Sequence, residues 1–227
     1  MPRGKQLKGE CAYCKATIPK NGVTRHLSTC IKRQAIIEQA ERKDAPNETL
    51  YHLRVQDAER SEFWLDLEMR GSKTLKDLDS YLRRIWLECC GHMSRFSIRG
   101  WQGEEIGKSR KVDQVFSRVI ELTHIYDFGT ESVTRIKAVE AREGKPTTKR
   151  PIALVARNLI PEFECIECEQ PATWLCTECL IEENEWASLC NKHAKSHAHD
   201  AYGKPIRLVN SPRLGMCGYE GPAKAPY

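Results

Sequence analysis

The chain has 227 residues, of which 40% are hydrophobic and 30% charged, and its formal net charge is +5. This length allows one large or two ordinary domains, and the apolar fraction supports only a modest core. The N-terminus lacks the apolar run of a signal peptide and residues 152–156, the longest clean apolar run, are far too few to cross a bilayer, so we expect a soluble, cytoplasmic protein without membrane contact.

The eleven cysteines are the most informative feature of the composition. In a reducing compartment, spaced cysteines are more often metal ligands than disulfide partners. The sequence therefore favours metal sites over an extracellular disulfide scaffold.

The positive charge is concentrated at the N-terminus. Residues 1–43 carry 10 basic and 3 acidic side chains, residues 44–150 carry 19 and 18, and residues 151–227 carry 7 and 10. Such asymmetry is typical of a contact with a polyanion at the basic end, and a solvated basic tail gives the same counts.

The first metal pattern is Cys11-x2-Cys14, eleven residues, then His26-x3-Cys30. It differs by one residue from the spacing of a ββα finger and replaces the last histidine with cysteine, which predicts a closed four-ligand zinc site. Two ligands four residues apart share one helix face, and strong helix formers continue to Arg42. We predict a zinc finger with a long helix over residues 1–43.

A nucleic acid bound by this finger would meet four side chains of its helix. A single finger reads only about three base pairs, so the finger alone is rarely sufficient for sequence specificity. A finger that docks a protein or caps the fold is the alternative interpretation. The candidate contacts to phosphates or bases are Thr24, Arg25, Lys32 and Arg33.

The middle of the chain, residues 50–157, has alternating strand patterns and one amphipathic helix. Pro46 lies in a linker, and strands are predicted at 51–55, 61–69, 93–99, 122–128, 133–139 and 152–157. In the second strand, apolar side chains at 63, 65, 67 and 69 alternate with acidic ones at 62, 66 and 68. Residues 103–111 are predicted to form an exposed loop and residues 112–116 a short helix.

A helix is predicted to start with a capping motif at residues 74–77 and to end at Gly91. We interpret its apolar stripe as core. Together with the strands it predicts an α+β domain with a small antiparallel or mixed sheet. The stripe consists of Leu75, Leu78, Leu82, Ile85, Trp86 and Cys89.

A second metal framework occupies the C-terminal part of the chain, residues 162–227. Its two Cys-x2-Cys knuckles, one Cys-x2-His knuckle and two trailing histidines are typical of zinc modules. Trp174, Leu175, Trp186 and Leu189 would supply a small core. The candidate ligands are Cys165, Cys168, Cys176, Cys179, Cys190, His193, His197 and His199, with Asp200 as an alternative to the last.

Several short blocks of the middle domain carry a family resemblance. The blocks at residues 74–78, 86–92 with Phe96, and 126–129 resemble the plasmid pRiA4b ORF-three-like family, which is also described as the TnpR passenger of insertion elements. The tail at residues 210–213 and 217–219 is similar to the ending of zinc-bearing members. The resemblance covers residues 50–142 and implies an α+β sheet fold and a link to mobile elements, but no established activity, so no catalytic residue is carried over.

Two details of these blocks allow other interpretations. Many relatives have Phe-Gly-Trp at the helix exit, where this chain has Cys89 and Cys90. We interpret the two cysteines as a half-buried structural pair, and the alternatives are a redox pair or a metal contact. The triplet at 127–129 matches the magnesium-binding triplet of protein kinases, but the rest of that signature is missing from the sequence. We predict a strand end that turns at Gly129.

The order of the C-terminal knuckles resembles a B-box, and this resemblance implies a cross-brace. One zinc would be held by Cys165, Cys168, Cys190 and His193, and the other by Cys176, Cys179, His197 and His199 or Asp200. The rival pairing is a single all-cysteine site with both Cys-x2-Cys knuckles, leaving Cys190 and the histidines in a separate or empty site.

Three closed zinc sites favour a protein that is not an enzyme, because a catalytic zinc usually keeps one position for water. We expect a zinc-binding adaptor or regulatory protein of plasmid or mobile-element type, which binds protein partners through its α+β core and its B-box-like module. The alternative is a nucleic-acid-binding protein that uses the basic finger, and a zinc-dependent hydrolase is a more distant one.

Overall fold

The structure is a computed structural model that describes residues 7–87, 91–183, 185–199 and 201–221. The described residues divide into two compact units, one within residues 7–82 and 92–159 and the other within residues 83–87, 91 and 160–221. None of the described helices is long and apolar enough to cross a membrane. Cys89, Cys90 and Asp200 lie outside the described residues.

The first unit is built on a nine-stranded sheet in which every strand pair is antiparallel, in the order β2-β1-β9-β4-β3-β8-β7-β5-β6. This confirms the α+β class, and the sheet is larger than predicted because the finger adds two strands and residues 105–106 add a third. The strands are β1 (Lys8–Cys11), β2 (Thr17–Pro19), β3 (Glu48–Asp57), β4 (Trp64–Arg70), β5 (Ser94–Ser97), β6 (Glu105–Ile106), β7 (Glu121–Tyr126), β8 (Ser132–Gly144) and β9 (Ile152–Asn158).

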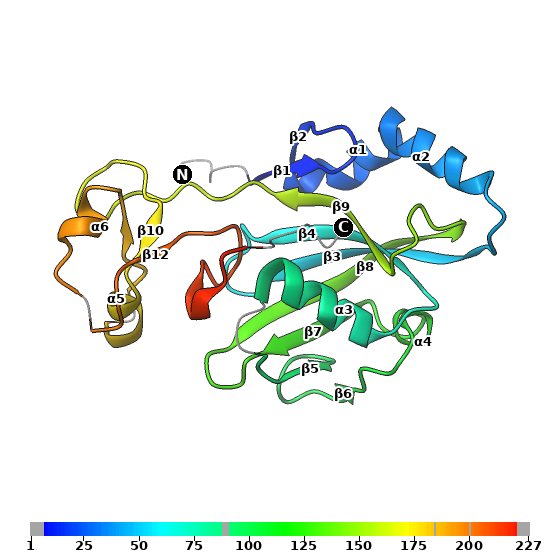
Figure 1. The fold of residues 1–227 in the computed structure, drawn as a ribbon. Helices are drawn as coiled ribbons and strands as arrows, with labels where there is room; N and C mark the ends of the chain where they lie inside the picture. Colours follow the sequence, from blue (N-terminus) through cyan, green and yellow to red (C-terminus); the bar gives the residue numbers. More distant parts are fainter. Residues whose placement is uncertain (1–6, 88–90, 184, 200, 222–227) are drawn as a thin grey trace, which may run out of the picture. The chain divides into compact units, whose positions relative to one another are not determined.

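Helix α3 (Leu75–Leu82) crosses one face of this sheet (Figure 1). Its start is capped as predicted, because Asp77 Oδ2 accepts from the Thr74 amide at 2.9 Å and from its hydroxyl at 2.8 Å. The predicted stripe is buried at every described position. The helix then widens into a π-type turn, η2 (Arg83–Leu87), which belongs to the second unit.

Two other predictions in this unit need adjustment. Helix α4 (Val112–Phe116) forms as expected, but the preceding loop contains the short strand β6. The turn after β7 includes Gly129, as predicted, but begins earlier, at Asp127: Asp127 has a φ of 63°, and its carboxylate accepts the amides of Gly129 and Thr130, both at 3.2 Å. The carboxylate stabilises the turn by an Asx-type interaction with the following amides.

The finger is part of the sheet. Strand β1 pairs antiparallel with β9, and Gly9 permits the close approach, since a Cβ there would lie 2.3 Å from the carbonyl oxygen of Arg157 and 2.4 Å from Trp64 Cζ2. One apolar cluster joins the two parts: Cys11, Ile18, Val23, Leu27 and Cys30 from the finger with Trp64, Val155 and Ala156 from the sheet.

The long finger helix predicted from the sequence is split. Helix α1 (Val23–Thr29), which follows the 3₁₀ turn η1 (Lys20–Gly22), ends at Cys30, whose backbone is extended with φ −73° and ψ 104°. Helix α2 (Ile31–Glu41) then starts in a new direction. Helix propensity alone predicted one continuous helix. The extended backbone at Cys30 interrupts it and places the Cys30 side chain beside the other finger cysteines.

Strand β4 is buried on both faces, including its acidic residues. Asp66 is fully buried and lies 2.5 Å from His52 Nε2 and 3.0 Å from Arg54 Nη2. Glu68 is 6% exposed and pairs with Arg142 at 2.9 Å and with Arg33 of α2 at 3.5 Å. These carboxylates tolerate burial because each one faces at least one arginine side chain.

The second unit contains a small sheet in the order β11-β10-β12. Its core includes Leu175 and Leu189, both fully buried, as predicted. The prediction for Trp186 was wrong: it is 45% exposed, and the buried residue next to it is Ala187. The elements are β10 (Trp174–Leu175), α5 (Thr177–Glu182), β11 (Ser188–Leu189), α6 (His193–Ser196), β12 (Ile206–Arg207) and the 3₁₀ turn η3 (Met216–Gly218).

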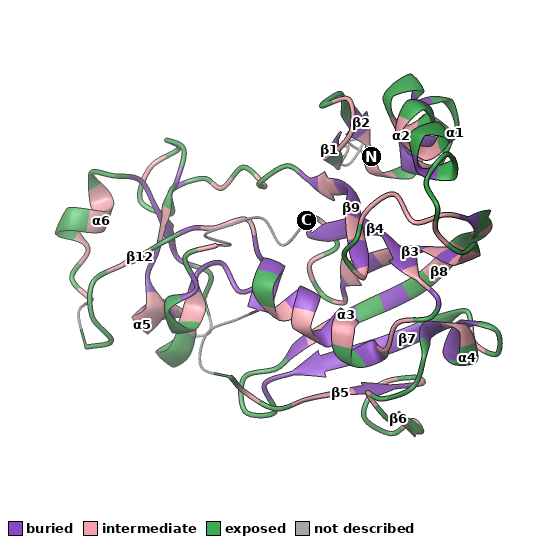
Figure 2. Cartoon of the chain, turned by 45° about the vertical axis from the view of Figure 1, so that its right-hand side comes forward, coloured by how far each residue is buried: buried purple, intermediate pink, exposed green. Residues whose placement is uncertain are grey.

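The tail of the second unit binds the backbone of the π-type turn. The Ser211 hydroxyl donates to the carbonyl of Trp86, and the Tyr219 hydroxyl donates to the carbonyl of Arg84 at 3.1 Å. Carbonyls in the last turn of a helix commonly accept hydrogen bonds from side chains, and these hydroxyls bind two carbonyls of the turn in this way. Both are buried, at 0% and 6% exposure. Figure 2 shows how burial varies along the chain, with strand β7 largely buried and helix α2 largely exposed.

Candidate metal centres

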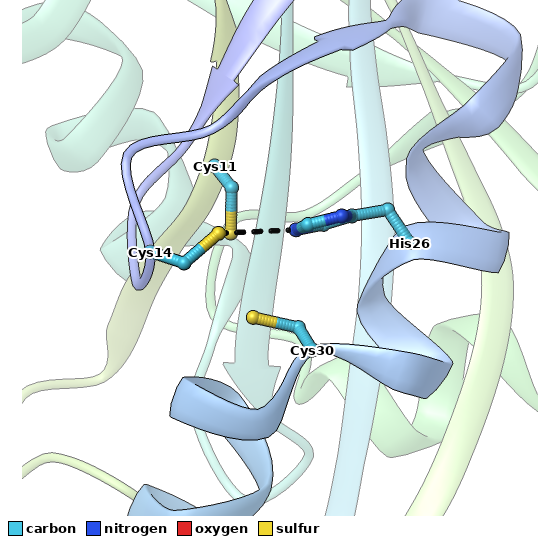
Figure 3. Close-up of side chains that lie close together, drawn as sticks. All are labelled: Cys11, Cys14, His26 and Cys30. Carbon is cyan, nitrogen blue, oxygen red and sulfur yellow. Dashed lines mark hydrogen bonds between the residues drawn. The ribbon is translucent and has the colours of Figure 1, made fainter.

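The N-terminal site collects four ligand atoms from a strand, a turn and the end of a helix. Cys11 ends β1 and Cys14 lies in the following turn, while His26 projects from α1 and Cys30 follows it (Figure 3). The turn is closed by hydrogen bonds between the backbones of Cys11 and residues 15 and 16. All four ligand atoms lie within 4.8 Å of one another.

The spacing between these atoms fits a tetrahedral zinc ion. Zinc bonds of about 2.3 Å to sulfur and about 2.0–2.1 Å to nitrogen place sulfur and nitrogen roughly 3.6 Å apart, and two sulfurs roughly 3.8 Å apart. Cys14 Sγ lies 3.3 Å from His26 Nε2. The donor set and its geometry therefore fit a structural Cys3His zinc site.

The environment of the thiols also favours a cation. Burial raises the pKa of the Cys11 thiol to about 11, because it disfavours the charged thiolate. A dication supplies the opposite charge that a buried thiolate needs.

The structure separates the four proposed nucleic-acid contacts. Arg25 and Lys32 are exposed and Thr24 is half-buried. Arg33 faces the sheet and donates to the carbonyl of Leu27 at 3.3 Å and to Glu68 at 3.5 Å. Arg33 thus contributes to the packing of the finger on the sheet, which leaves two exposed cations among the four candidates.

The first module site brings together Cys165, Cys168, Cys190 and His193. Nδ1 of the histidine lies 3.3 Å from each of the first two sulfurs and 3.6 Å from the third, and two sulfurs, of Cys168 and Cys190, lie 3.9 Å apart. These distances match the edges expected for a Cys3His zinc tetrahedron. Burial opposes ionisation of Cys165, but hydrogen bonds from the backbone of Cys190 and from His193 outweigh it and lower its pKa to about 6.

The second module site brings together Cys176, Cys179, His197 and His199. Cys179 Sγ lies 3.3 Å from Nε2 of His197 and 3.0 Å from Nδ1 of His199, and burial raises its pKa to about 12. The two module groups interleave along the chain, as the resemblance to a B-box implies, and differ from the sequential all-cysteine pairing.

Two histidines only two residues apart can reach one ion because the backbone is extended there. His197 ends α6 with φ −64° and ψ 127°, and residues i and i+2 of an extended segment point to the same side. The two rings use different nitrogens, and their centroids lie 4.8 Å apart at 74°.

Carboxylates face the nitrogens of the module histidines that point away from the ligand clusters. Glu167 Oε1 lies 2.8 Å from Nδ1 of His197, and its Oε2 lies 4.0 Å from Nε2 of His193, so one side chain spans both sites. Glu183 lies 4.0 Å from Nε2 of His199. Such outer partners fix the tautomer and the orientation of a metal-bound histidine. We did not predict these residues from the sequence, although a glutamate inside the Cys-x-Glu-Cys knuckle was an available signal.

Replacing Glu167 with glutamine is expected to weaken zinc binding at both module sites by about 10- to 100-fold, because outer-shell carboxylates contribute to metal affinity on this scale. The measurement is a competition titration with a chromophoric chelator. Glu169→Gln, in the same segment, is the control and should leave the affinities unchanged. Equal affinities for the two variants would contradict the role of Glu167.

Each of the three clusters could supply a full set of protein ligands to a zinc ion. Each cluster offers four protein ligands, the number that fills a tetrahedral structural site. A cavity of about 660 Å³ borders the second module site and is lined in part by His197, His199 and Trp174. Both histidines direct one nitrogen into the ligand cluster, so the cavity is next to the site without supplying an open coordination position.

No family model and no curated protein matches the chain. Part of the chain is similar to the crystal structure of a protein of unknown function from Methanosarcina mazei Go1, with 19% sequence identity, a TM-score of 0.42, and coverage of 48% of this chain and 70% of that one.

Proposed function

We propose that the protein is a non-enzymatic, zinc-dependent adaptor in which three zinc ions have a structural role. The observation that supports this is the set of four protein ligands at each cluster, eight cysteines and four histidines in all, each of them buried or half-buried. Four protein ligands fill a tetrahedral structural zinc site and leave no position for water. Partner binding then depends on the surfaces that the metals hold in place, those of the α+β core and of the B-box-like module. The resemblance to plasmid and mobile-element proteins suggests where such partners occur.

A second candidate function is nucleic-acid binding by the basic N-terminal region. Arg25 and Lys32 are exposed on the finger, where they could contact phosphates. Because Arg33 is engaged with Glu68, the finger offers few cations by itself, and further basic residues would have to contribute.

The proposal predicts three zinc ions per chain, measured by elemental mass spectrometry on protein purified without added metal. Cys217 is exposed and lies outside the three clusters, so the Cys217→Ser variant is the matched control and should also retain three ions. A count of one or two ions in the wild type would contradict the ligand assignment.

A cobalt-substituted protein tests the structural role of the metals. Closed tetrahedral sites should keep their visible spectra when azide or cyanate is added, since the anion finds no exchangeable position. A spectral change at the second module site would show an open position there and would favour the hydrolase alternative.

A further inference from the structure

The finger packs against one face of the sheet of the first unit. The strand register shows which residues of the sheet lie on this face. Cross-strand partners share a face, as do residues two apart in a strand. Trp64 lies in the finger cluster and pairs with Gln56, which pairs in turn with Arg135. Arg135 pairs with Thr123 of β7, which extends the same face toward β5.

The apolar cluster of the finger covers the part of this face formed by β4 and β9. Farther along, Arg135 and Lys137 of β8 are both exposed. Among the described residues neither forms an ion pair, although Glu121 lies opposite Lys137 in the register. Lys20 of the finger borders this area, because its ammonium group donates to Gln56 and to the carbonyl of Ser61.

Aromatic and apolar side chains gather at the β5 end of the same face. Arg95 pairs with Ile125 and therefore shares the face, and its guanidinium lies 5.4 Å from the ring centre of Trp101. Trp101 and Phe128 are each 38% exposed, with ring centres 4.8 Å apart. The amide of Gly100 donates to the Thr123 hydroxyl, which fixes the loop of Trp101 against the face.

Acidic groups only partly offset these cations. Glu105 lies 3.7 Å from Arg95 and is itself 62% exposed, and Glu121 is exposed. Asp66 is buried and already paired with His52 and Arg54. The exposed centre of the face is therefore basic, with two rings at its edge.

We propose that this surface, defined by Arg95, Trp101, Phe128, Arg135 and Lys137 and here named the open face, binds single-stranded nucleic acid. Exposed rings next to a basic track are the combination that single strands need, because unpaired bases stack on the rings while cations contact the phosphates. A duplex keeps its bases stacked inside and cannot use the rings in this way. The inference goes beyond the zinc-dependent role and uses side chains that bind no metal.

The test is fluorescence anisotropy with a labelled oligothymidylate and a duplex of the same length, at low salt. We expect the single strand to bind more tightly than the duplex. Trp101→Ala should weaken single-strand binding by about 5- to 150-fold, the range found for loss of one base–aromatic stack. Trp186→Ala is the matched control, because Trp186 is a similarly exposed tryptophan of the second unit.

The charged residues are tested by salt dependence. Changing both Arg135 and Lys137 to Ala should lower the slope of log Kd against log salt by about 1.4, since each lost phosphate contact removes about 0.7 for a single strand. The double change of Arg25 and Lys32 to Ala distinguishes the finger from the open face and should have a smaller effect.

Four results would overturn the proposal: no binding at low salt, tighter binding of the duplex, wild-type affinity of the Trp101→Ala variant, or loss of binding only in the finger variant. Zinc content is measured for every variant. A variant of the open face that loses binding but retains three zinc ions supports the open face as the binding surface. A low zinc count in the wild type would contradict the zinc-dependent role, whereas the binding measurements would still test the open face.

Discussion

Replacing Cys11 with serine is expected to remove one zinc ion and to destabilise the large sheet as well as the finger. Cys11 is both a ligand and a fully buried member of the cluster that contains Trp64, Val155 and Ala156. In finger peptides a structural zinc contributes an apparent binding free energy of about 10–16 kcal/mol. The apolar contacts of the cluster remain when the metal is lost, so the loss of stability here is smaller than that. We expect a loss in the free energy of unfolding of at least about 3 kcal/mol, comparable to truncation of a large core side chain.

The measurement is chemical denaturation together with amide hydrogen exchange. Because β1 pairs with β9, protection should fall along β9 as well as in the finger. Cys217→Ser controls for the substitution itself. Unchanged protection in β9 of the Cys11→Ser variant would show that the finger folds independently of the sheet.

Replacing Cys190 with serine is expected to open the first module site before the second. In the interleaved grouping Cys190 shares its site with Cys165 and Cys168, whereas in a sequential grouping it would lie outside the all-cysteine site. Loss of this ligand should free the thiols of Cys165 and Cys168 for alkylation. The module depends on metal for much of its stability, since its core is small, and its unfolding temperature should fall by a large amount.

Alkylation mapped by mass spectrometry distinguishes the two groupings. In the Cys190→Ser variant Cys165 and Cys168 should react first, and Cys176 and Cys179 should react later. The same comparison in a Cys176→Ser variant should reverse the order. Protection of all four cysteines after loss of Cys190 would contradict the cross-brace.

The sequence predicted features that depend on local spacing. The finger ligands, the stripe of α3 and the short helix at Val112–Phe116 are each contained within about twenty consecutive residues, and the structure forms each of them. Metal ligands are predictable in the same way, because Cys and His at fixed offsets have few other uses in a reducing compartment.

Features that depend on distant partners could not be predicted. The alternation in β4 indicated one polar face, but Asp66 and Glu68 are buried because Arg54, Arg33 and Arg142 come from three other segments. Trp186 has the apolar side chain of a core residue, yet the small module places Ala187 inside. The outer-shell role of Glu167 depends on two histidines that approach it only after folding.

The pairing of β1 with β9 has a consequence for folding during synthesis. The two strands are separated by most of the first unit, since β1 begins at Lys8 and β9 ends at Asn158. At about 5–20 residues per second, the ribosome needs roughly 7 to 30 s to produce the partner strand. During that interval the finger can take up zinc, but the edge of β1 is unpaired and the apolar residues of the finger cluster are exposed to solvent. Unpaired strand edges promote aggregation. Chaperone dependence of the nascent chain would thus follow from the topology of the sheet.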